Sequence, residues 1–190
     1  MERPRSLCKY FDDRRWAEAF LNGDMRFQTL AAFCHWEEQG VRGDRNEGTA
    51  FFAPDAGLEI TNQTQGTRFR MPAHRLVSAV RHDEIFVFCL SRTWSRRLWD
   101  EFGAIACVEI FDIPAFCARV AAGLPEGARM GGKPGRERIG RRVEYYRPED
   151  ADGTRWALPD QIACSKLDAY EWQDEFRLVF SLTDAWRSRT

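Results

Sequence analysis

The chain has 190 residues, of which 44% are hydrophobic and 13% aromatic. This length and apolar content predict one globular domain over residues 1–190 and exclude a disordered chain. The formal net charge is −1, because 28 Lys and Arg residues nearly balance 29 Asp and Glu residues. Overall charge therefore gives no reason to expect a nucleic-acid-binding protein.

The six cysteines are scattered without a CxxC or CxxH pair, and several lie inside apolar runs. We expect free thiols rather than disulfides or a zinc site. The three histidines form no helical pair suited to a metal, so no metal site is predicted. The first residues lack the apolar stretch of a signal peptide, and no apolar run has the length of a membrane span. These features predict a cytoplasmic protein without a membrane partner.

Hydrophobic spacing and capping residues divide the chain into short elements. The first half predicts a strand at 7–10, a helix from Asp12 or Asp13 to Gly23, an extended stretch at 25–28, a helix at 29–40, a polar loop at 42–49 and meandering strands over 49–82. The second half predicts a strand at 84–91, a helix from Ser95 to Gly103, a strand at 104–112, a helix at 113–125, a mobile Gly- and Arg-rich segment at 127–142, a strand at 141–146, a loop at 147–158 and a strand at 174–180. Strands separated by a few short helices, without βαβ regularity, indicate the α+β class.

Hydroxyl groups close the apolar strand at 84–91, where Ser91, Arg92 and Thr93 follow one another. Hydroxyls at the end of a strand bind ligands in clefts, and they also cap a following helix. On residue type alone capping is favoured, because Ser and Thr are preferred at helix starts.

The last strand carries a polar row, since Gln173, Glu175 and Arg177 fall on one side and Asp174, Phe176, Leu178 and Phe180 fall on the other. A carboxylate beside an amide is suited to holding a sugar hydroxyl and to stabilising developing positive charge. The alternative is a solvated face on which Glu175 and Arg177 are exposed neighbours. An exposed ion pair of this kind stabilises the fold by under ~1 kcal/mol. The spacing alone favours the solvated face.

A third polar group joins Lys9 and Tyr10 with the loop at 42–48. It suits a phosphate or an adenine, although turn-forming residues in a surface loop need no function.

The order of these three groups resembles the layout of the ADP-ribosyltransferases of the arginine–serine–glutamate branch, whose motifs are an Arg, an S-T-S and a Q/E-x-E. The chain also resembles a bacterial domain family of unknown function, with its K/H-Y pair, N-D/E-G loop, F-S-L-S strand with an L-W helix, and W-x-x-E-x-R. The corresponding stretches here are KY, RNEGT, FCLSRTWSRRLW and EWQDEFR.

The resemblance implies a split sandwich of two antiparallel sheets with short flanking helices, and NAD bound in the cleft between the sheets. Glu175 would match the catalytic glutamate, which holds the nicotinamide ribose and stabilises an oxocarbenium-like centre as nicotinamide leaves. Gln173 would match the position that orients the acceptor. As a residue of a surface cleft, Glu175 is expected to contribute little to folding stability.

The other matching residues would bind the cofactor. Ser91 and Thr93 would match the serine motif that supports the glutamate and the ribose. Lys9, followed by Tyr10, stands where the branch has its arginine and would hold the diphosphate or the ribose. Arg92 replaces the central Thr of the serine motif, and Lys9 lacks the planar fork of an arginine.

The resulting hypothesis is NAD-dependent ADP-ribosyl transfer to a protein or nucleic-acid acceptor, in a bacterial toxin or anti-phage defence protein. One alternative is a binding module of the same fold without chemistry. These two differ in whether Glu175 lies in a cleft beside Ser91 or on an open face. A third reading, a nucleic-acid-directed toxin, requires one basic surface formed by Arg136, Arg138, Arg141 and Arg142.

Overall fold

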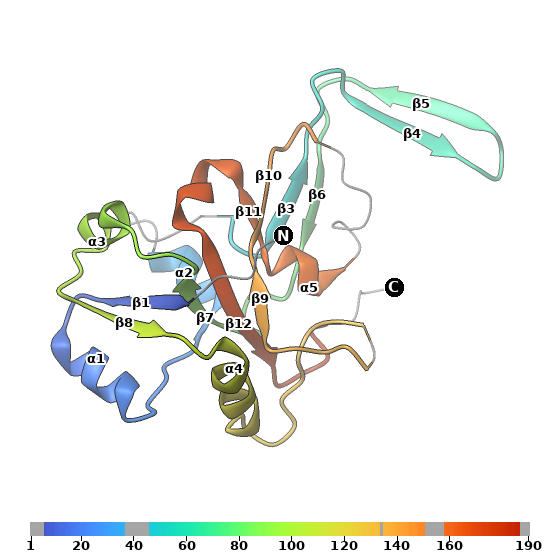
Figure 1. Ribbon diagram of the computed structural model, residues 1–190. Helices are drawn as coiled ribbons and strands as arrows, with labels where there is room; N and C mark the ends of the chain where they lie inside the picture. Colours follow the sequence, from blue (N-terminus) through green and yellow to red (C-terminus); the bar gives the residue numbers. More distant parts are fainter. Residues whose placement is uncertain (1–5, 37–45, 134, 151–157, 187–190) are drawn as a thin grey trace.

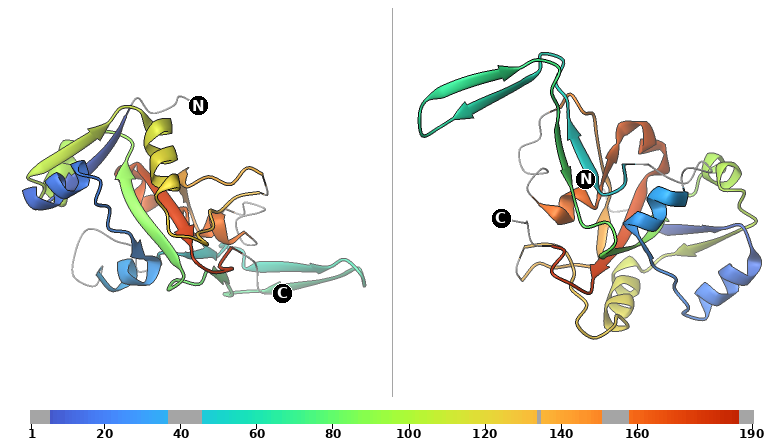
Figure 2. Two further views of the ribbon diagram at one scale, coloured as in Figure 1. Left: turned by 90° about the horizontal axis from the view of Figure 1, so that it is seen from below. Right: turned by 180° about the vertical axis from the view of Figure 1, so that it is seen from behind.

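The computed structural model describes residues 6–36, 46–133, 135–150 and 158–186 (Figures 1 and 2). The helices are α1 (Arg14–Leu21), α2 (Leu30–Trp36), α3 (Arg96–Glu101), α4 (Ile113–Ala122), α5 (Pro159–Ile162) and the 3₁₀-helix η3 (Asp168–Gln173). The strands are β1 (Leu7–Phe11), β2 (Gln28–Thr29), β3 (Thr49–Phe52), β4 (Leu58–Asn62), β5 (Thr67–Met71), β6 (Leu76–Ala79), β7 (Ile85–Ser91), β8 (Ala106–Ile110), β9 (Gly140–Arg142), β10 (Glu144–Tyr146), β11 (Ser165–Leu167) and β12 (Glu175–Ser181). The predicted α+β class is confirmed.

A six-stranded antiparallel sheet in the order β8-β1-β7-β12-β9, with β2 also paired to β7, is the centre of the fold. β12 pairs with β7 along its whole length, from Glu175 opposite Ser91 to Ser181 opposite Ile85. Three two-stranded ladders stand beside this sheet: β3-β6 and β4-β5 are antiparallel, and β10-β11 is parallel. The two most apolar predicted strands thus form the middle of the sheet.

The helices begin where the sequence places their capping residues. The Asp13 carboxylate accepts a hydrogen bond from the backbone N–H of Arg15 at the start of α1. Ser95 caps α3 and Asp112 caps α4 in the same way, through the N–H groups of Leu98 and Ala115. A side-chain acceptor at this position satisfies a backbone donor that the helix itself leaves unpaired.

The two faces of the central sheet bury different cores. On one face, helices α1 and α4 cover an aromatic cluster in which Phe20 stacks on Phe88 and meets Phe116 edge-on. On the other face, α2, α5 and the β3-β6 and β10-β11 ladders pack around Val87 and Val179. Glu175 and Arg177 share this second face with Val179, because alternate residues of a strand point the same way.

One edge of β7 is shared by two short neighbours. β1 pairs with it at Cys8 and Ser91, and β2 pairs with it only opposite Val87 and Phe86. Residues 88–90, between these pairings, have a ladder partner among the described strands only on the β12 side. The sheet therefore opens between β1 and β2, and we call this opening the split edge of β7.

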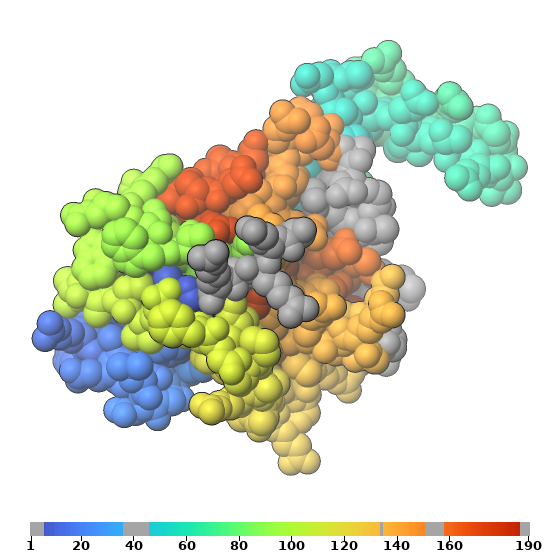
Figure 3. Space-filling model, viewed as in Figure 1, coloured from blue at the N-terminus to red at the C-terminus, as the bar shows by residue number. Residues whose placement is uncertain are grey.

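Strands β3 to β6 form one long ribbon whose outer half stands clear of the rest of the molecule (Figures 1 and 3). We call this outer half, the β4-β5 hairpin of residues 58–71, the arm. Ile60 and Phe69 face each other across the arm and are 48% and 54% exposed. The strands predicted over 49–82 are confirmed, but they pair as one long hairpin, β3 with β6 and β4 with β5, and not as a meander.

The strand predicted at 141–146 is divided into β9, which pairs with β12, and β10, which pairs with β11. Two other features also differ from the sequence-based prediction. The segment 127–142 is not mobile along its whole length, because Ile139 is buried and β9 pairs with β12 in the central sheet. The last strand begins at Glu175, because the backbone of Asp174 is left-handed, with φ 42°, and Gln173 ends η3. A Gly- and Arg-rich composition concealed the first feature, and the unbroken polar alternation concealed the second.

Candidate functional site

A cleft of about 670 Å³ lies at the split edge of β7. Its walls come from β1, from α1, from the segment leading into β2 and from residues 87–91 of β7. Five of the six predicted site residues line it: Lys9, Tyr10, Ser91, Gln173 and Glu175. Thr93, the sixth, is exposed and is not among the lining residues.

Ser91 and Glu175 are direct partners across the β7-β12 ladder. Residues paired in this way lie on the same face of a sheet, with their Cα atoms about 4.5–5.5 Å apart. Both also line the cleft. The expectation that the two motifs face one cavity is confirmed, and an open, solvated face for Glu175 is excluded.

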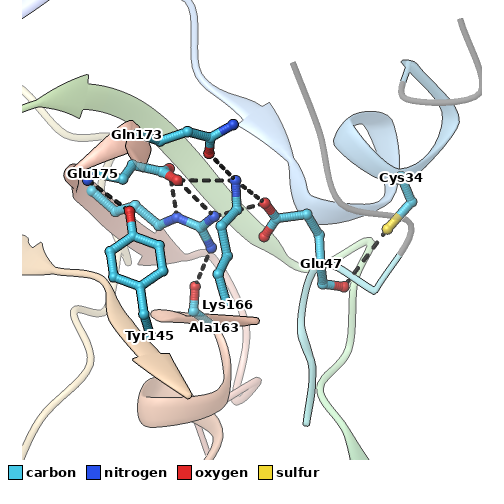
Figure 4. A network of polar contacts seen from close by, with 8 residues as sticks. Cys34, Glu47, Tyr145, Ala163, Lys166, Gln173 and Glu175 are labelled. Carbon is cyan, nitrogen blue, oxygen red and sulfur yellow. Dashed lines mark hydrogen bonds and ion pairs between the residues drawn. The ribbon is translucent and has the colours of Figure 1, made fainter. Parts of the chain in front are cut away.

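Glu175 belongs to a buried cluster of two acids and two bases, Glu47, Lys166, Glu175 and Arg177, which we call the tetrad (Figure 4). Glu175 Oε1 lies 2.7 Å from Arg177 Nε, and its Oε2 lies 3.0 Å from Lys166 Nζ. Glu47 Oε1 lies 2.8 Å from Lys166 Nζ and 2.7 Å from an Arg177 Nη. The formal charges of the four side chains cancel.

Opposite charges within the tetrad keep Glu175, Lys166 and Arg177 ionised despite their burial. Burial alone would raise the pKa of Glu175, but the nearby charges of Arg177 and Lys166 outweigh burial and hold this pKa well below its usual range. Burial would lower the pKa of Lys166, and the carboxylates of Glu175 and Glu47 instead raise it above its usual range. The carboxylate of Glu175 is therefore anionic at neutral pH and is already paired.

Side-chain and backbone contacts hold the turn that precedes Glu175, the first residue of β12. The Arg92 guanidinium lies 2.9 Å from the Asp174 carboxylate, and the Arg92 N–H donates to the Asp174 carbonyl at 2.8 Å. The Ser91 hydroxyl donates to the Gln173 carbonyl at 3.1 Å, and the Glu175 N–H donates to the Tyr145 hydroxyl at 2.8 Å. Arg92, which departs from the S-T-S motif, here holds the left-handed residue before Glu175.

Lys9 and Tyr10 have different surroundings. The Lys9 ammonium donates to the Cys89 carbonyl at 2.9 Å and lies 4.3 Å from the centre of the Phe88 ring, so it reaches across the split edge. The Tyr10 hydroxyl accepts from the Ser95 N–H at 2.7 Å and donates to the Thr93 carbonyl at 3.3 Å. Burial, opposed by the Ser95 hydrogen bond, raises the pKa of Tyr10 to about 12. Tyr10 is thus a neutral residue that ties β1 to the turn after β7.

Sequence reasoning missed two members of the site, Glu47 and Lys166. Glu47 stands in the polar loop noted before the meandering strands, and it is 2% exposed. Lys166 is 3% exposed on β11, where a lysine gives no apolar signal. A buried lysine requires a carboxylate partner. Lys166 has two, Glu47 at a distance of 119 positions in the sequence and Glu175 at a distance of 9, and no sequence pattern reveals such pairings.

Aromatic side chains make up much of the remaining cleft wall. Phe20, Phe33, Phe88 and Phe102 line it together with Trp16, which is 55% exposed. Flat apolar walls with a few charged groups are typical of sites for planar small molecules. Among the described residues, no group of His, Cys, Asp or Glu side chains is placed to hold a metal ion.

The basic surface required by the nucleic-acid reading is incomplete. Arg141 lies 2.5 Å from the Asp160 carboxylate, so its charge is neutralised locally. Arg136, Arg138 and Arg142 are exposed.

The chain matches no protein-family model, no curated protein and no solved structure. Within the ranges that the structure describes, no helix is both long and apolar enough to cross a membrane.

Proposed function

We propose that this chain binds NAD in the cleft at the split edge of β7 and transfers ADP-ribose to a macromolecular acceptor. The proposal includes the split-sandwich fold of the ADP-ribosyltransferases, for which the opening of the sheet between β1 and β2 is the supporting feature. The observation that carries the proposal is the pairing of Ser91 with Glu175 in a cleft that Lys9 crosses from the neighbouring strand.

The size and chemistry of the cleft suit a dinucleotide. Its volume of about 670 Å³ falls within the range of ~300–1,000 Å³ usual for cofactor sites. The exposed ring of Trp16 offers a stacking surface for a planar base, and the ammonium of Lys9 offers a charge for a diphosphate. Glu175, a member of the tetrad, and Gln173, which accepts a hydrogen bond from the Lys166 ammonium of the tetrad, both line the cleft.

The chemical step breaks the bond between the ribose C1′ and the nicotinamide nitrogen. The bonding electron pair leaves with the nicotinamide, and positive charge develops on the ribose. A fixed carboxylate at Glu175 stabilises that charge more than it stabilises the ground state. A nucleophilic group of the acceptor then bonds to C1′ and releases its proton to solvent.

One observation favours a second candidate, a binding module without chemistry. Both oxygens of Glu175 are already engaged, by Arg177 and by Lys166. A carboxylate that faces two cations has less net charge to offer an oxocarbenium-like centre. On this reading the cleft holds a nucleotide, and the tetrad serves only to shape the wall.

Release of nicotinamide from NAD by the purified protein, with and without cell lysate as a source of acceptor, tests the proposal. We expect release from the native protein and a loss of a hundredfold or more, on the order of 3 kcal/mol, in a Glu175→Gln variant. Glu59→Gln, an exposed carboxylate of the arm, is the matched control and should release nicotinamide normally.

Because Glu175 is buried, its replacement can lower stability as well as activity, so a second variant outside the tetrad is needed. Lys9→Met leaves the tetrad intact and should raise KM for NAD more than it lowers kcat. NAD that binds without any cleavage would favour the binding module. Failure of NAD to bind would overturn the transferase, and failure of other nucleotides to bind as well would overturn the binding module.

The proposed setting is a toxin or anti-phage defence protein. Expression of the native chain in bacteria should then slow growth, whereas expression of the Glu175→Gln variant at equal soluble level should not. Equal growth of the two cultures, with NAD cleavage intact in vitro, would argue against this setting.

A further inference from the structure

Strand β8 is the last strand on one side of the central sheet. It pairs with β1 along its whole length, from Leu7 opposite Ile110 to Phe11 opposite Ala106. Among the strands that the structure describes, none pairs with its other edge. Figure 2 shows β8 at the outer side of the sheet, and its yellow-green atoms lie on the face shown in Figure 3. An edge strand presents a row of backbone N–H and C=O groups with which another strand can pair.

The sequence of this edge lacks the residues that usually protect an edge strand from pairing. Residues 105–111 read IACVEIF and contain no Lys, Arg, Pro or Gly, and Glu109 is their one charged residue. Ile105 and Phe111, which flank the strand, are 56% and 72% exposed. Short exposed segments with high β-propensity and little charge readily pair with another strand. This edge therefore fits a strand partner better than it fits solvent.

A second copy of the chain fits the edge because the segment is complementary to itself. A two-fold axis through Val108, normal to the sheet, makes the two β8 strands antiparallel and keeps each face of the sheet on its own side. Residues equally far from Val108 in opposite directions then lie opposite each other. Each Ile105 lies opposite the partner's Phe111, so the exposed apolar side chains at the two ends of the segment cover each other.

Charge favours the same register. Glu109 lies opposite the partner's Cys107, so the two carboxylates are not direct neighbours. A register centred on Glu109 would instead place the two carboxylates directly opposite each other, and like charges in that position destabilise a ladder. The alternate residues Ala106, Val108 and Ile110 are unaffected, because they pack in each copy on the aromatic cluster that α1 and α4 cover.

We propose that two copies of the chain pair antiparallel through β8, about a two-fold axis at Val108, and form a dimer with one continuous sheet. None of residues 105–111 lines the cleft, so the paired segment and the candidate site are separate parts of the molecule. The inference therefore does not depend on the proposed function.

Sedimentation velocity of the native protein tests the dimer. An interface built on one pair of strands is at the small end of specific interfaces, so the measurement should cover about 1 to 100 µM protein. We expect the mass to rise with concentration from the 22.1 kDa of one chain toward twice that value. A single-chain mass over the whole range would overturn the proposal and would leave the edge to a strand of a different protein.

Amide hydrogen exchange of the native protein locates the interface without any substitution. Residues 105–111 should exchange more slowly at the high end of the concentration range than at the low end, because pairing protects their outward N–H groups. The arm should exchange equally at both ends. A dimer whose β8 amides exchange at the same rate as those of the single chain would overturn pairing through this strand.

Two substitutions then place a charge at either end of the paired segment. Ile105→Lys and Phe111→Glu change exposed side chains, so both variants should fold, which circular dichroism checks. Each should need at least about tenfold more protein than the native chain to dimerise, because a charge then lies against an apolar side chain. Ile60→Lys, at a 48% exposed apolar position of the arm, is the matched control and should dimerise like the native chain. Loss of the dimer in this control alone would place the interface on the arm and overturn the proposal.

A mixture of the two variants tests the register. In a mixed dimer the lysine introduced at position 105 lies opposite the glutamate introduced at position 111, and the other Ile105–Phe111 pair is unchanged. Opposite charges across a ladder stabilise it, so mixing equal amounts should restore a species with the mass of two chains. A mixture that remains monomeric would overturn the pairing centred on Val108.

Discussion

At the scale of single residues, Glu175 carries both a structural and a proposed chemical task. It is 5% exposed and contacts Arg177 and Lys166 directly. The sequence-based expectation that it contributes little to stability does not hold for such a position, because an unbalanced buried charge is costly. Any kinetic result at Glu175 must therefore be read beside a stability measurement.

Glu175→Gln should lower the free energy of unfolding by about 3 kcal/mol, because the two cations of the tetrad then face only Glu47. Urea denaturation followed by tryptophan fluorescence measures this change. The matched control, Glu59→Gln, breaks only a surface contact of 3.5 Å with Arg68 and should cost less than ~0.5 kcal/mol. Equal stability of the two variants would contradict the structural role of the tetrad.

The tetrad also makes stability depend on pH in acid. The folded-state pKa of Glu175 lies below its ordinary value of 4.5, so the unfolded chain binds the proton more readily. Stability from Glu175 is complete above that ordinary value and is lost as the pH falls through and below it. Urea denaturation between pH 7 and pH 3 should show this decline in the native protein and a shallower decline in Glu175→Gln. Parallel curves would contradict the assignment.

The contribution of Trp16 to NAD binding can be tested without a change in folding stability. Its side chain is 55% exposed at the cleft, so Trp16→Ala should leave the free energy of unfolding nearly unchanged. Loss of a stacking surface for a base is worth about 1–3 kcal/mol, and NAD should bind at least several-fold more weakly. Trp94→Ala, at 58% exposure and outside the cleft, is the control and should bind NAD normally.

At the scale of secondary structure, local signals were sufficient for most helices and strands. Helix starts were predicted at Asp12 or Asp13 and at Ser95, because a cap acts only on residues two or three positions away, and the structure has Asp13 and Ser95 as the caps. β9 was recognised only in part: the strand predicted at 141–146 includes two of its residues, but its pairing with β12 spans more than thirty residues and its composition is that of a loop. Clustering of Ser91, Gln173 and Glu175 was expected from the resemblance, whereas Glu47 and Lys166 join the site only through long-range contacts.

Gly140 shows why β9 has a loop-like composition. A Cβ atom at this position would lie 2.6 Å from the Phe176 ring and 2.9 Å from Cys117 Sγ. Gly140→Ala should therefore destabilise the protein by about 1–3 kcal/mol through overpacking. Gly123→Ala is the control, because a Cβ there meets nothing closer than 3.6 Å. Equal melting temperatures for the two variants would contradict the pairing of β9 with β12.

At the scale of the whole molecule, the arm is set apart from the cores. Its residues belong to none of the three buried clusters, and it extends away from the central sheet (Figure 3). Replacing residues 59–70 by an Asn-Gly turn should leave the free energy of unfolding within about 0.5 kcal/mol of the native value, because an isolated two-stranded hairpin contributes little. Leu178→Ala, at a fully buried position, should by contrast cost about 2–5 kcal/mol.

The width of the cleft at the split edge of β7 is set by the backbone and not by side chains. Residues 88–90, left between the pairings of β1 and β2, span roughly 10 Å at about 3.3 Å per residue. Residues 12–27 join the two flanking strands, so one continuous piece of chain frames the aperture on both sides. Substitutions can change what the aperture accepts, but only a change in the number of residues in that frame, or in the ladder register, will change how wide it is.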